Sequence, residues 1–367
     1  MSSEIEQRVI DGTAWDEFCD QMKIAGKLIQ RPETPTDAFN KAEGYRYLAR
    51  KMRGALQGAL EYGDPAFPVL QPSPPEGAKT GADNPDNYYE SCSLNPKYDY
   101  KITGTRGTVD FIGFSTKGGS YGKDGNLLPT GYFDSTMLEV DDNGYFELII
   151  SQKEHPGNWL PMEAHTNSMI SRQTFQDRSV EKRGHLKIER INASGTPEPF
   201  SAEKLDRALR SAAAQTLGTV NLFIDWADSY SSHVNELPHI DQNICQRAGG
   251  DPTIYYFHSK WALADDEALI IEAKTIPKCQ TWNFQLDNFW MESLDYFNHT
   301  IHTNKGIATY EDDGSVRLVV AHQDPGLPNW IDTCSHNDGT MCWRWIGATE
   351  YPGLETRVVK FSELASI

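Results

Sequence analysis

The sequence has few basic residues for its length. Its 34 lysines and arginines stand against 52 aspartates and glutamates, which gives a formal net charge of −18 at pH 7. Proteins bind nucleic acids through clustered basic side chains that release counterions from the phosphate backbone. Anionic membrane surfaces also attract basic segments. We therefore expect neither nucleic acid nor a membrane among the partners of this protein.

Long hydrophobic runs are also absent. No apolar segment approaches the roughly 20 residues that a helix needs to cross a bilayer. The first 31 residues lack the basic and then apolar order of a signal peptide. The six cysteines include no C-x-x-C pair, so we expect free thiols rather than disulfides. These absences predict a cytoplasmic protein.

Three motifs of common enzymes are missing from the sequence. It has no G-x-S-x-G elbow, which leaves a serine nucleophile without support. It has no Rossmann fingerprint, and its glycine-rich segment 117–131 does not match a phosphate-binding loop. We expect that segment to be an ordinary loop. The sequence predicts no cofactor and no redox chemistry.

The spacing of apolar residues divides the chain into helical and strand regions. Spacings of three and four mark the N-terminal region, where Thr34 is an expected N-cap, and a central region, where Ser201 is another. Elsewhere, short alternating segments separated by turn residues predict antiparallel strands in a sandwich or barrel. The expected parts are an N-terminal helical region over 1–63, a first β half over 64–200 that begins with a connection over 64–87, a helical insert over 201–252 and a second β half over 253–367.

Two stretches of the sequence are similar to each other. Residues 141–161 and 312–333 each contain an acidic-glycine turn, a β-branched strand, a Pro-Gly corner and an Asn-Trp pair. The repetition predicts a duplicated β architecture. The shared residues are expected to be architectural, because an asparagine can satisfy the backbone at a corner and an indole can fill the end of a sandwich. They are Asn158 with Asn329, and Trp159 with Trp330.

The last hundred residues resemble a known family. The likeness is carried by the segment Phe289–Asp295, by Pro325-Gly326 and Asn329-Trp330-Ile331, and by Arg344-Trp345. These residues resemble the family called domain of unknown function 1214, often paired with a module numbered 1254, most clearly over 282–345. The resemblance implies a jelly-roll-like β-sandwich with accompanying helices and leaves the activity open. The family commonly continues Asn-Trp-Leu-Pro, whereas this chain has Ile331-Asp332 after the tryptophan. The expected fold class is therefore α+β, predominantly β, with two antiparallel jelly-roll-like sandwich halves.

Polar residues found only in the second copy indicate where chemistry could occur. A histidine held by an aspartate is a usual general base, and an arginine stabilises developing negative charge. The predicted catalytic residues are His322, Asp332, His336 and Arg344. The alternative is that Asp332 forms an ion pair with Arg344 and the histidines are surface or core groups. Arg172 occupies a place analogous to Arg344, and we expect it to form an ion pair with Asp177.

Metal binding is a second possibility at His299 and His302, which are three residues apart. On an extended strand such residues point to opposite faces, so they could share a metal only across a turn or helix. We predict no metal site and keep a metal-dependent enzyme at these histidines as an alternative.

The sequence favours an enzyme that uses acid-base chemistry, in hydrolysis, hydration or elimination, on a small and largely apolar organic molecule. Aromatic residues would line its pocket, as is usual for such sites. The expected wall residues are Trp282, Trp290, Tyr296 and Trp330. One alternative is a non-catalytic binding or carrier protein. In another, tryptophan-rich surfaces form a subunit interface, with a homodimer as the candidate assembly.

Overall fold

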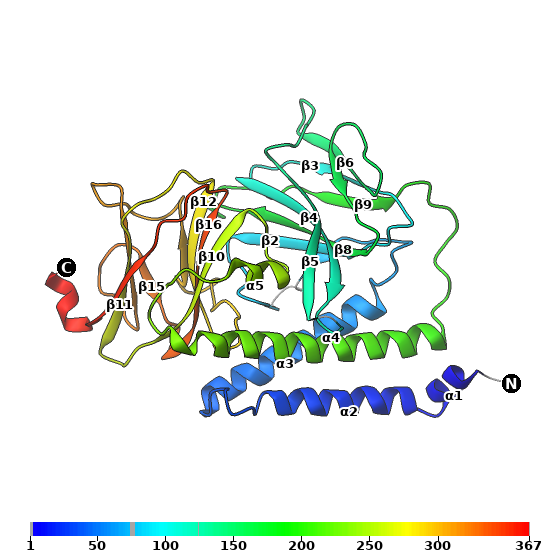
Figure 1. Ribbon diagram of the computed structural model, residues 1–367, viewed down its shortest axis with the longest axis horizontal. Coiled ribbons are helices and arrows are strands. Elements are labelled where there is room, and N and C mark those ends of the chain that lie inside the picture. Colours follow the sequence, from blue (N-terminus) through cyan, green and yellow to red (C-terminus); the bar gives the residue numbers. More distant parts are fainter. Residues whose placement is uncertain (1–2, 74–77, 124, 367) are drawn as a thin grey trace.

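The computed structural model describes residues 3–73, 78–123 and 125–366 (Figure 1). The described helices are α1 (Glu4–Ile10), α2 (Thr13–Leu28), α3 (Ala38–Leu60), α4 (Ala202–Ser229) and α5 (Gln242–Arg247), with 3-10 turns η1 (Tyr230–Ser232) and η2 (Phe361–Ser366). The first group of strands is β1 (Gln71–Pro72), β2 (Asn87–Ser93), β3 (Tyr100–Thr105), β4 (Phe111–Ser120), β5 (Asn126–Asp134), β6 (Tyr145–Ser151), β7 (Trp159–Pro161), β8 (Thr166–Thr174) and β9 (Leu186–Arg190). The second is β10 (Ile254–Ala262), β11 (Glu267–Ala273), β12 (Thr281–Asp287), β13 (His302–Asn304), β14 (Val316–Ala321), β15 (Trp330–Asp332), β16 (Asp338–Ile346) and β17 (Glu355–Lys360).

The two β halves have the same topology. In the first half the strand orders are β1-β2-β8-β4-β5 and β7-β6-β3-β9, and in the second they are β10-β16-β12-β13 and β15-β14-β11-β17. Apart from β1, each strand of the first half therefore has a counterpart in the second, and the counterparts follow in the same order along the chain. This confirms the predicted α+β fold with two sandwich-like halves and shows that the duplication extends over eight strands.

Each half buries a core of its own between its two sheets. The core of the first half includes Tyr100, Phe114 and Leu148, and that of the second includes Trp261 and Phe284. In each half the Asn-Trp pair leads into a short strand that runs parallel to its neighbour, β7 beside β6 and β15 beside β14. Parallel pairing needs a crossover connection, and the Pro-Gly corners lie in these connections.

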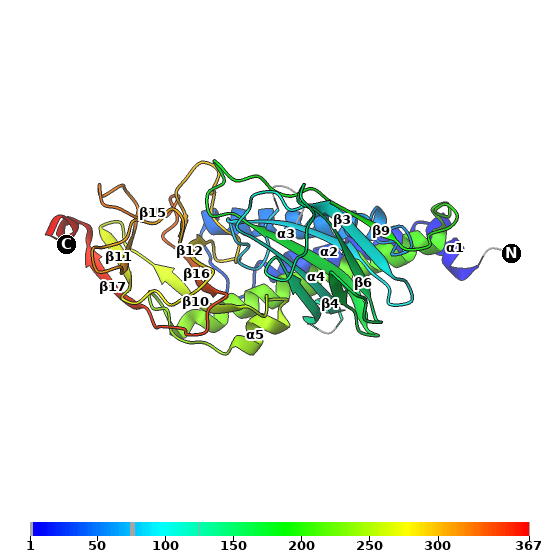
Figure 2. The same cartoon turned by 90° about the horizontal axis from the view of Figure 1, so that it is seen from above.

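The long helices lie together along one side of the molecule, next to both sandwiches (Figure 1). The view in Figure 2 shows the two sandwiches following one another along the long axis, with the N-terminus and the C-terminus at opposite ends. Helix α4 packs against α2 and α3. Its buried face includes Leu209, Val220 and Phe223, and Ser201 caps it by accepting a hydrogen bond from the backbone of Lys204, as predicted.

Two local predictions are wrong. Asp37, rather than Thr34, is the N-cap of α3 and accepts from the backbone of Asn40, while the Thr34 hydroxyl donates to backbone carbonyls at the end of the preceding turn. The glycine-rich segment 117–131 is largely a β4–β5 hairpin, because backbone pairing runs from Ser120 opposite Asn126 into both strands. Residue 124 of that segment, and residues 74–77 of the expected connection over 64–87, lie outside the described residues.

Within the described part of the chain, no helix combines the length and apolar character that spanning a membrane requires. The six cysteines are all free.

Candidate ligand-binding site

A cavity of about 380 Å³ lies where the two β halves meet helices α3 and α4. Strands β2, β4 and β8 of the first half and β10 and β16 of the second contribute side chains to its wall. Helix α3 contributes Arg50 and Lys51, and α4 contributes Phe223 and Trp226. Both halves of the chain are therefore needed to form it.

Two tyrosine-arginine pairs occupy equivalent places in this cavity. Tyr89 on β2 lies opposite Arg172 on β8, and Tyr256 on β10 lies opposite Arg344 on β16. All four side chains line the cavity. Since β2 corresponds to β10 and β8 to β16, each sandwich supplies one such pair.

The segments that precede β2 and β10 are also equivalent, and each contacts the other half. The backbone N–H of Asn84 donates to the Tyr89 hydroxyl at 3.0 Å, and that of Asp251 donates to the Tyr256 hydroxyl at 3.1 Å. The residue two positions before Asn84 and the residue two positions before Asp251 both have a left-handed backbone conformation, with φ of 53° at Ala82 and 85° at Gly249.

The two arginines exchange hydrogen bonds across the boundary between the halves. Arg172 of the first half donates from Nη2 to the carbonyl of Gly249 at 3.0 Å. Arg344 of the second half donates from Nη2 to the carbonyl of Ala82. Each guanidinium is therefore held by its own sheet and by the pre-strand segment of the other half.

The surroundings of the two arginines differ in charge. Arg344 donates to the neutral side chains of Gln285 at 2.6 Å and Asn283 at 3.4 Å. Arg172 faces the carboxylate of Asp251, with 3.4 Å between Nη1 and Oδ2. The residue equivalent to Asp251 is the neutral Asn84. Among the described residues, the charge of Arg344 therefore has no hydrogen-bonded carboxylate, whereas that of Arg172 has one.

Lys117 adds a third buried basic group. It lies on β4, its side chain is about 1% exposed, and its Nζ donates to the carbonyl of Gly250 at 3.2 Å. Burial and the nearby Arg172 together lower the pKa of Lys117 to about 7, against the opposing effect of Asp251. Small electrostatic changes near Lys117 can therefore switch its charge at neutral pH.

Helix α3 brings two more basic groups to the cavity, and these have acidic partners. Arg50 pairs with the buried Glu292 at 2.8 Å. Burial lowers the pKa of Lys51 to about 8, while Glu292 and Asp83 oppose that shift. This side of the cavity is balanced in charge.

A neutral imidazole completes the polar lining. His258 is stacked on Tyr256 and on Tyr230, with interplanar angles of 9° and 8°, and burial together with Arg344 lowers its pKa to about 3. Several buried atoms of the lining have no hydrogen-bond partner within the described residues. They are His258 Nδ1, Trp226 Nε1, Asn84 Nδ2 and Asn87 Oδ1.

Of the four predicted catalytic residues, only Arg344 lines this cavity. His322 directly follows β14, Asp332 ends β15 and His336 lies in the turn after β15, and both histidines contact Thr333. His322 Nδ1 is 2.8 Å from the Thr333 hydroxyl oxygen, and His336 Nδ1 is 3.2 Å from the Thr333 carbonyl oxygen. Asp332 pairs with His299 rather than with Arg344, so the ion pair weighed as an alternative is not formed. A catalytic role for these three residues stays a prediction.

The aromatic residues expected as pocket walls do not line the cavity. Trp282 and Trp290 are fully buried inside the chain, where Trp282 stacks on Trp343 and Trp290 packs against Tyr47 of α3. Tyr296 lies beneath the ammonium of Lys79, and Trp330 packs in a separate small core and donates to the carbonyl of Ala321. Because the first two indoles are buried, they form no exposed subunit interface either.

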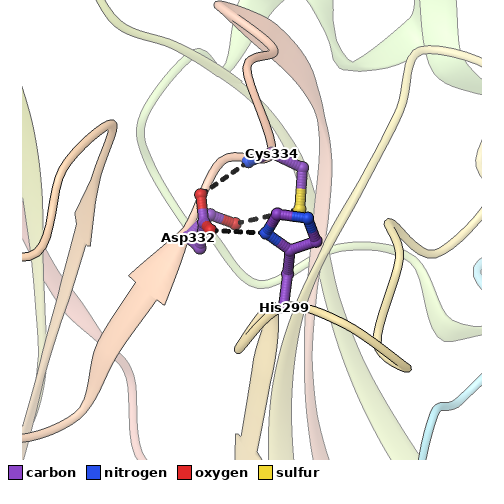
Figure 3. A group of neighbouring side chains, drawn as sticks. All are labelled: His299, Asp332 and Cys334. Carbon is purple, nitrogen blue, oxygen red and sulfur yellow. Dashed lines mark hydrogen bonds and ion pairs between the residues drawn. The ribbon is translucent and has the colours of Figure 1, made fainter.

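The two histidines considered for a metal face different partners. His299 Nδ1 lies 2.7 Å from Asp332 Oδ2, and His302 Nε2 lies 3.1 Å from Asp86 Oδ1. Instead, His299, Asp332 and Cys334 place one potential ligand atom each within 4.8 Å of one another (Figure 3). Burial, and after it Asp332, raises the pKa of Cys334 to about 12, so its thiol is protonated at neutral pH and is a weak metal ligand.

The expected Arg172–Asp177 ion pair is wrong, because Arg172 pairs with Asp251 and Asp177 accepts hydrogen bonds within its own turn. The sequence did contain a signal for the cavity. Residues 84–89 read Asn-Pro-Asp-Asn-Tyr-Tyr, and residues 251–256 read Asp-Pro-Thr-Ile-Tyr-Tyr. A comparison of the two halves over their full length would have aligned these segments and found both tyrosines.

One solved structure matches almost the whole chain. It is an uncharacterized protein from Burkholderia cenocepacia, with 46% sequence identity, a TM-score of 0.96 and coverage of 98% of this chain and 100% of that chain. This chain belongs to the same family. A structure of a Vibrio parahaemolyticus protein matches at 10% identity with a TM-score of 0.48, over 87% of this chain and 98% of that chain. Searches of family models and of curated proteins found no match, so the resemblance over 282–345 stays a prediction.

Proposed function

We propose that this protein binds a small organic anion in the cavity between its two halves. The observation that carries the proposal is the charge of the lining. Its basic members are Arg50, Lys51, Lys117, Arg172 and Arg344, and its only acidic member among the described residues is Asp83. In a chain with a net charge of −18, a concentration of positive charge at this one buried place needs a reason.

The reason lies in the free energy that burying these charges costs. A charged group removed from water is destabilising unless it is paired and hydrogen-bonded. Arg344 is 4% exposed, and the hydrogen-bond acceptors that the described part of the chain offers it are neutral. A bound carboxylate would supply the missing counter-charge, because the planar guanidinium matches carboxylate geometry.

The remainder of the lining indicates a partly apolar ligand. Phe223, Trp226 and Ile170 offer hydrophobic surface in the same cavity. Small-molecule sites commonly combine apolar walls with a few placed polar groups. An aromatic or short aliphatic acid fits this combination better than an inorganic anion.

Catalysis by acid-base chemistry is a second candidate, and the observation that favours it is His258. His258 lines the cavity, its imidazole is neutral, and its Nδ1 lacks a partner in the described part of the chain. An anion bound beside this imidazole would raise its pKa, which would let it accept a proton from the substrate. The acid-base enzyme predicted at His322, Asp332 and His336 would instead act outside this cavity. Hydrolysis, hydration or elimination is the reaction range that either version predicts.

The binding proposal can be tested with matched anionic and neutral probes. Thermal shift and calorimetry would compare benzoate with benzamide, and glutarate and isophthalate with their diamides. Anions should raise the melting temperature, because a ligand that binds only the folded state stabilises it. The neutral amides should not. If none of these anions binds, or if the amides bind equally well, the proposal is wrong.

A catalytic role would be tested separately. Turnover of ester and amide derivatives of the same acids would be measured for the wild-type protein and for His258→Gln and His322→Gln. Loss of turnover only in His258→Gln would place the chemistry in the cavity, and loss only in His322→Gln would place it beside Thr333, at the ends of β14 and β15. No turnover with the wild-type protein in the presence of anion binding would favour a carrier.

A further inference from the structure

The duplicated architecture says more about the ligand than the charge of the lining does. A site formed once by each half contains two equivalent guanidinium groups, one from β8 and one from β16. We propose that the ligand is a compact diacid, with one carboxylate bound at Arg344 and the other between Arg172 and Lys117. This inference rests on the proposed function and specifies its ligand class.

Two positive charges around the cavity lack an acidic partner among the described residues, so a ligand with two negative charges would neutralise them. Arg344 contributes one uncompensated positive charge. Asp287 is the carboxyl with the largest effect on the pKa of Arg344. Burial raises the pKa of Asp287 itself to about 8, so Asp287 is mostly protonated at neutral pH. Arg172 is offset by Asp251, so Lys117 beside them contributes a second positive charge when it is protonated. A monoanion would leave one of these two charges buried without a partner.

The two arginines act on the same region of the cavity. Burial raises the pKa of Tyr89, and Arg344 and Arg172 both oppose that rise. Both guanidinium groups therefore lie within electrostatic range of one hydroxyl group. They remain separately anchored, because each donates to the carbonyl of the opposite pre-strand segment. Two carboxylates, one at each anchored guanidinium, would leave both of these hydrogen bonds in place.

The two subsites differ in charge, so the two ends of an asymmetric ligand would bind in a preferred orientation. The segment of the first half has Asn84 where the segment of the second has Asp251. As a result, the Arg344 subsite has a fixed positive charge, and the Arg172 subsite has a charge that depends on Lys117. Asn84, Trp226 and His258 also belong to the lining, and each has a buried nitrogen without a hydrogen-bond partner in the described part of the chain.

The decisive probes are a diacid and its monoamide, which have nearly the same size and differ by one charge. We would measure the affinity of isophthalate against 3-carbamoylbenzoate, and of glutarate against glutaramate, by calorimetry. Each diacid should bind roughly ten- to a hundredfold more tightly than its monoamide, as expected for a buried charge-assisted contact. If each monoamide binds as tightly as its diacid, the diacid inference fails and the proposed function stands. If neither member of any pair binds, the proposed function fails as well.

Variants assign the two subsites. Lys117→Met should abolish most of the preference for the diacid, so that the diacid and its monoamide bind with similar affinities. Lys187→Met, at an exposed lysine of β9, is the control and should change neither affinity. Unchanged discrimination in Lys117→Met would contradict the assignment.

Arg344→Met tests the fixed-charge subsite by removing its charge. Arg344→Lys is a second test, which keeps the buried positive charge and is used if Arg344→Met does not fold. Because a lysine cannot donate two parallel hydrogen bonds, Arg344→Lys should lower the affinities for the monoamide and for the diacid by the same factor. Circular dichroism would confirm that the variant is folded. If the folded Arg344→Lys protein binds each ligand with the same affinity as the wild type, the assignment of a carboxylate to Arg344 is wrong.

Discussion

Asn158 and Asn329 use their side chains in the same way at corresponding corners of the two sandwiches. The amide of Asn158 accepts from the backbone N–H of Glu139 and donates to the carbonyl of the same residue, both at 2.8 Å. Asn329 accepts from the N–H of Thr309 at 2.8 Å and donates to its carbonyl at 2.7 Å. Each amide donates in addition to a carbonyl of the neighbouring strand. The architectural role predicted from the sequence is confirmed for both asparagines.

These contacts predict unequal losses of stability on substitution. Asn158→Ala should lower the free energy of unfolding by about 1–3 kcal/mol, because it leaves backbone groups without partners. Asn329→Ala should cost about 1 kcal/mol more, since Asn329 has a left-handed φ of 55° that alanine adopts with strain. Chemical denaturation would measure both. Asn143→Ala, in the exposed turn before β6, is the control, and an equal effect at Asn158 and Asn329 would contradict the argument.

Helix α3 contains two glycines in opposite surroundings. A Cβ at Gly44 would overlap the indole of Trp290 and the side chain of Ile29, whereas a Cβ at Gly58 would meet nothing within 4 Å. Gly44→Ala should therefore destabilise the protein by about 1–3 kcal/mol through overpacking. Gly58→Ala should stabilise it by about 0.5–1 kcal/mol through helix propensity. Urea denaturation curves of the two variants would show shifts of opposite sign, and shifts of the same sign would show that α3 packs differently.

The pH dependence of anion binding should follow the charge of Lys117. Its pKa is lowered to about 7, so the free protein loses this positive charge as the pH rises above 7. An anion favours the protonated form, and its binding must then be accompanied by proton uptake. Affinity for a diacid should fall by up to about tenfold per pH unit above pH 7.

Calorimetry in two buffers with different ionisation enthalpies would count the protons taken up on binding. Lys117→Met should show less proton uptake than the wild type and a shallower fall in affinity between pH 7 and 9. Proton uptake equal to that of the wild type would assign the linkage to another group, such as Lys51, whose pKa is lowered to about 8.

Asp287 should make the folded state less stable as the pH rises. Burial raises its pKa from 3.8 to about 8, so between these values the folded protein holds a proton that the unfolded chain releases. The free energy of unfolding should therefore decrease from about pH 4 to about pH 8, by at most about 1.4 kcal/mol per pH unit from this group.

Asp287→Asn removes the titration and should flatten the dependence over that range. The measurement is chemical denaturation at a series of pH values. Asp312→Asn, at an exposed position before β14, controls for the loss of any carboxylate. An Asp287→Asn profile parallel to that of the wild type would show that Asp287 is ionised in the fold.

The sequence was informative about architecture because architecture repeats in local patterns. Alternating strands, turn residues and the two Asn-Trp corners are each visible within about twenty residues, and they predicted two sandwich-like halves. The cap of α3 was misplaced because Thr34 and Asp37 both fit the N-cap pattern, and only the path of the preceding turn decides between them.

The site was harder to predict because it is formed by residues far apart in the chain. Arg344 was identified, and Arg172 was noted as its analogue, but their common cavity depends on how the halves are placed against α3 and α4. Proximity in sequence gathered His322, Asp332 and His336 into one group, whereas their partners in space are Thr333 and His299. Lys117 gave no signal, since a single lysine in a glycine-rich segment is ordinary until its burial is known.

The exchange of hydrogen bonds between Arg172 and Gly249, and between Arg344 and Ala82, bears on the origin of the chain. An ancestor with a single sandwich would have completed such a cavity only by pairing with a second copy of itself, and every change would then have occurred twice. Fusion into one polypeptide would have removed that constraint. Asp251 could then diverge from Asn84, and the two equivalent ends of the cavity could become unequal in charge.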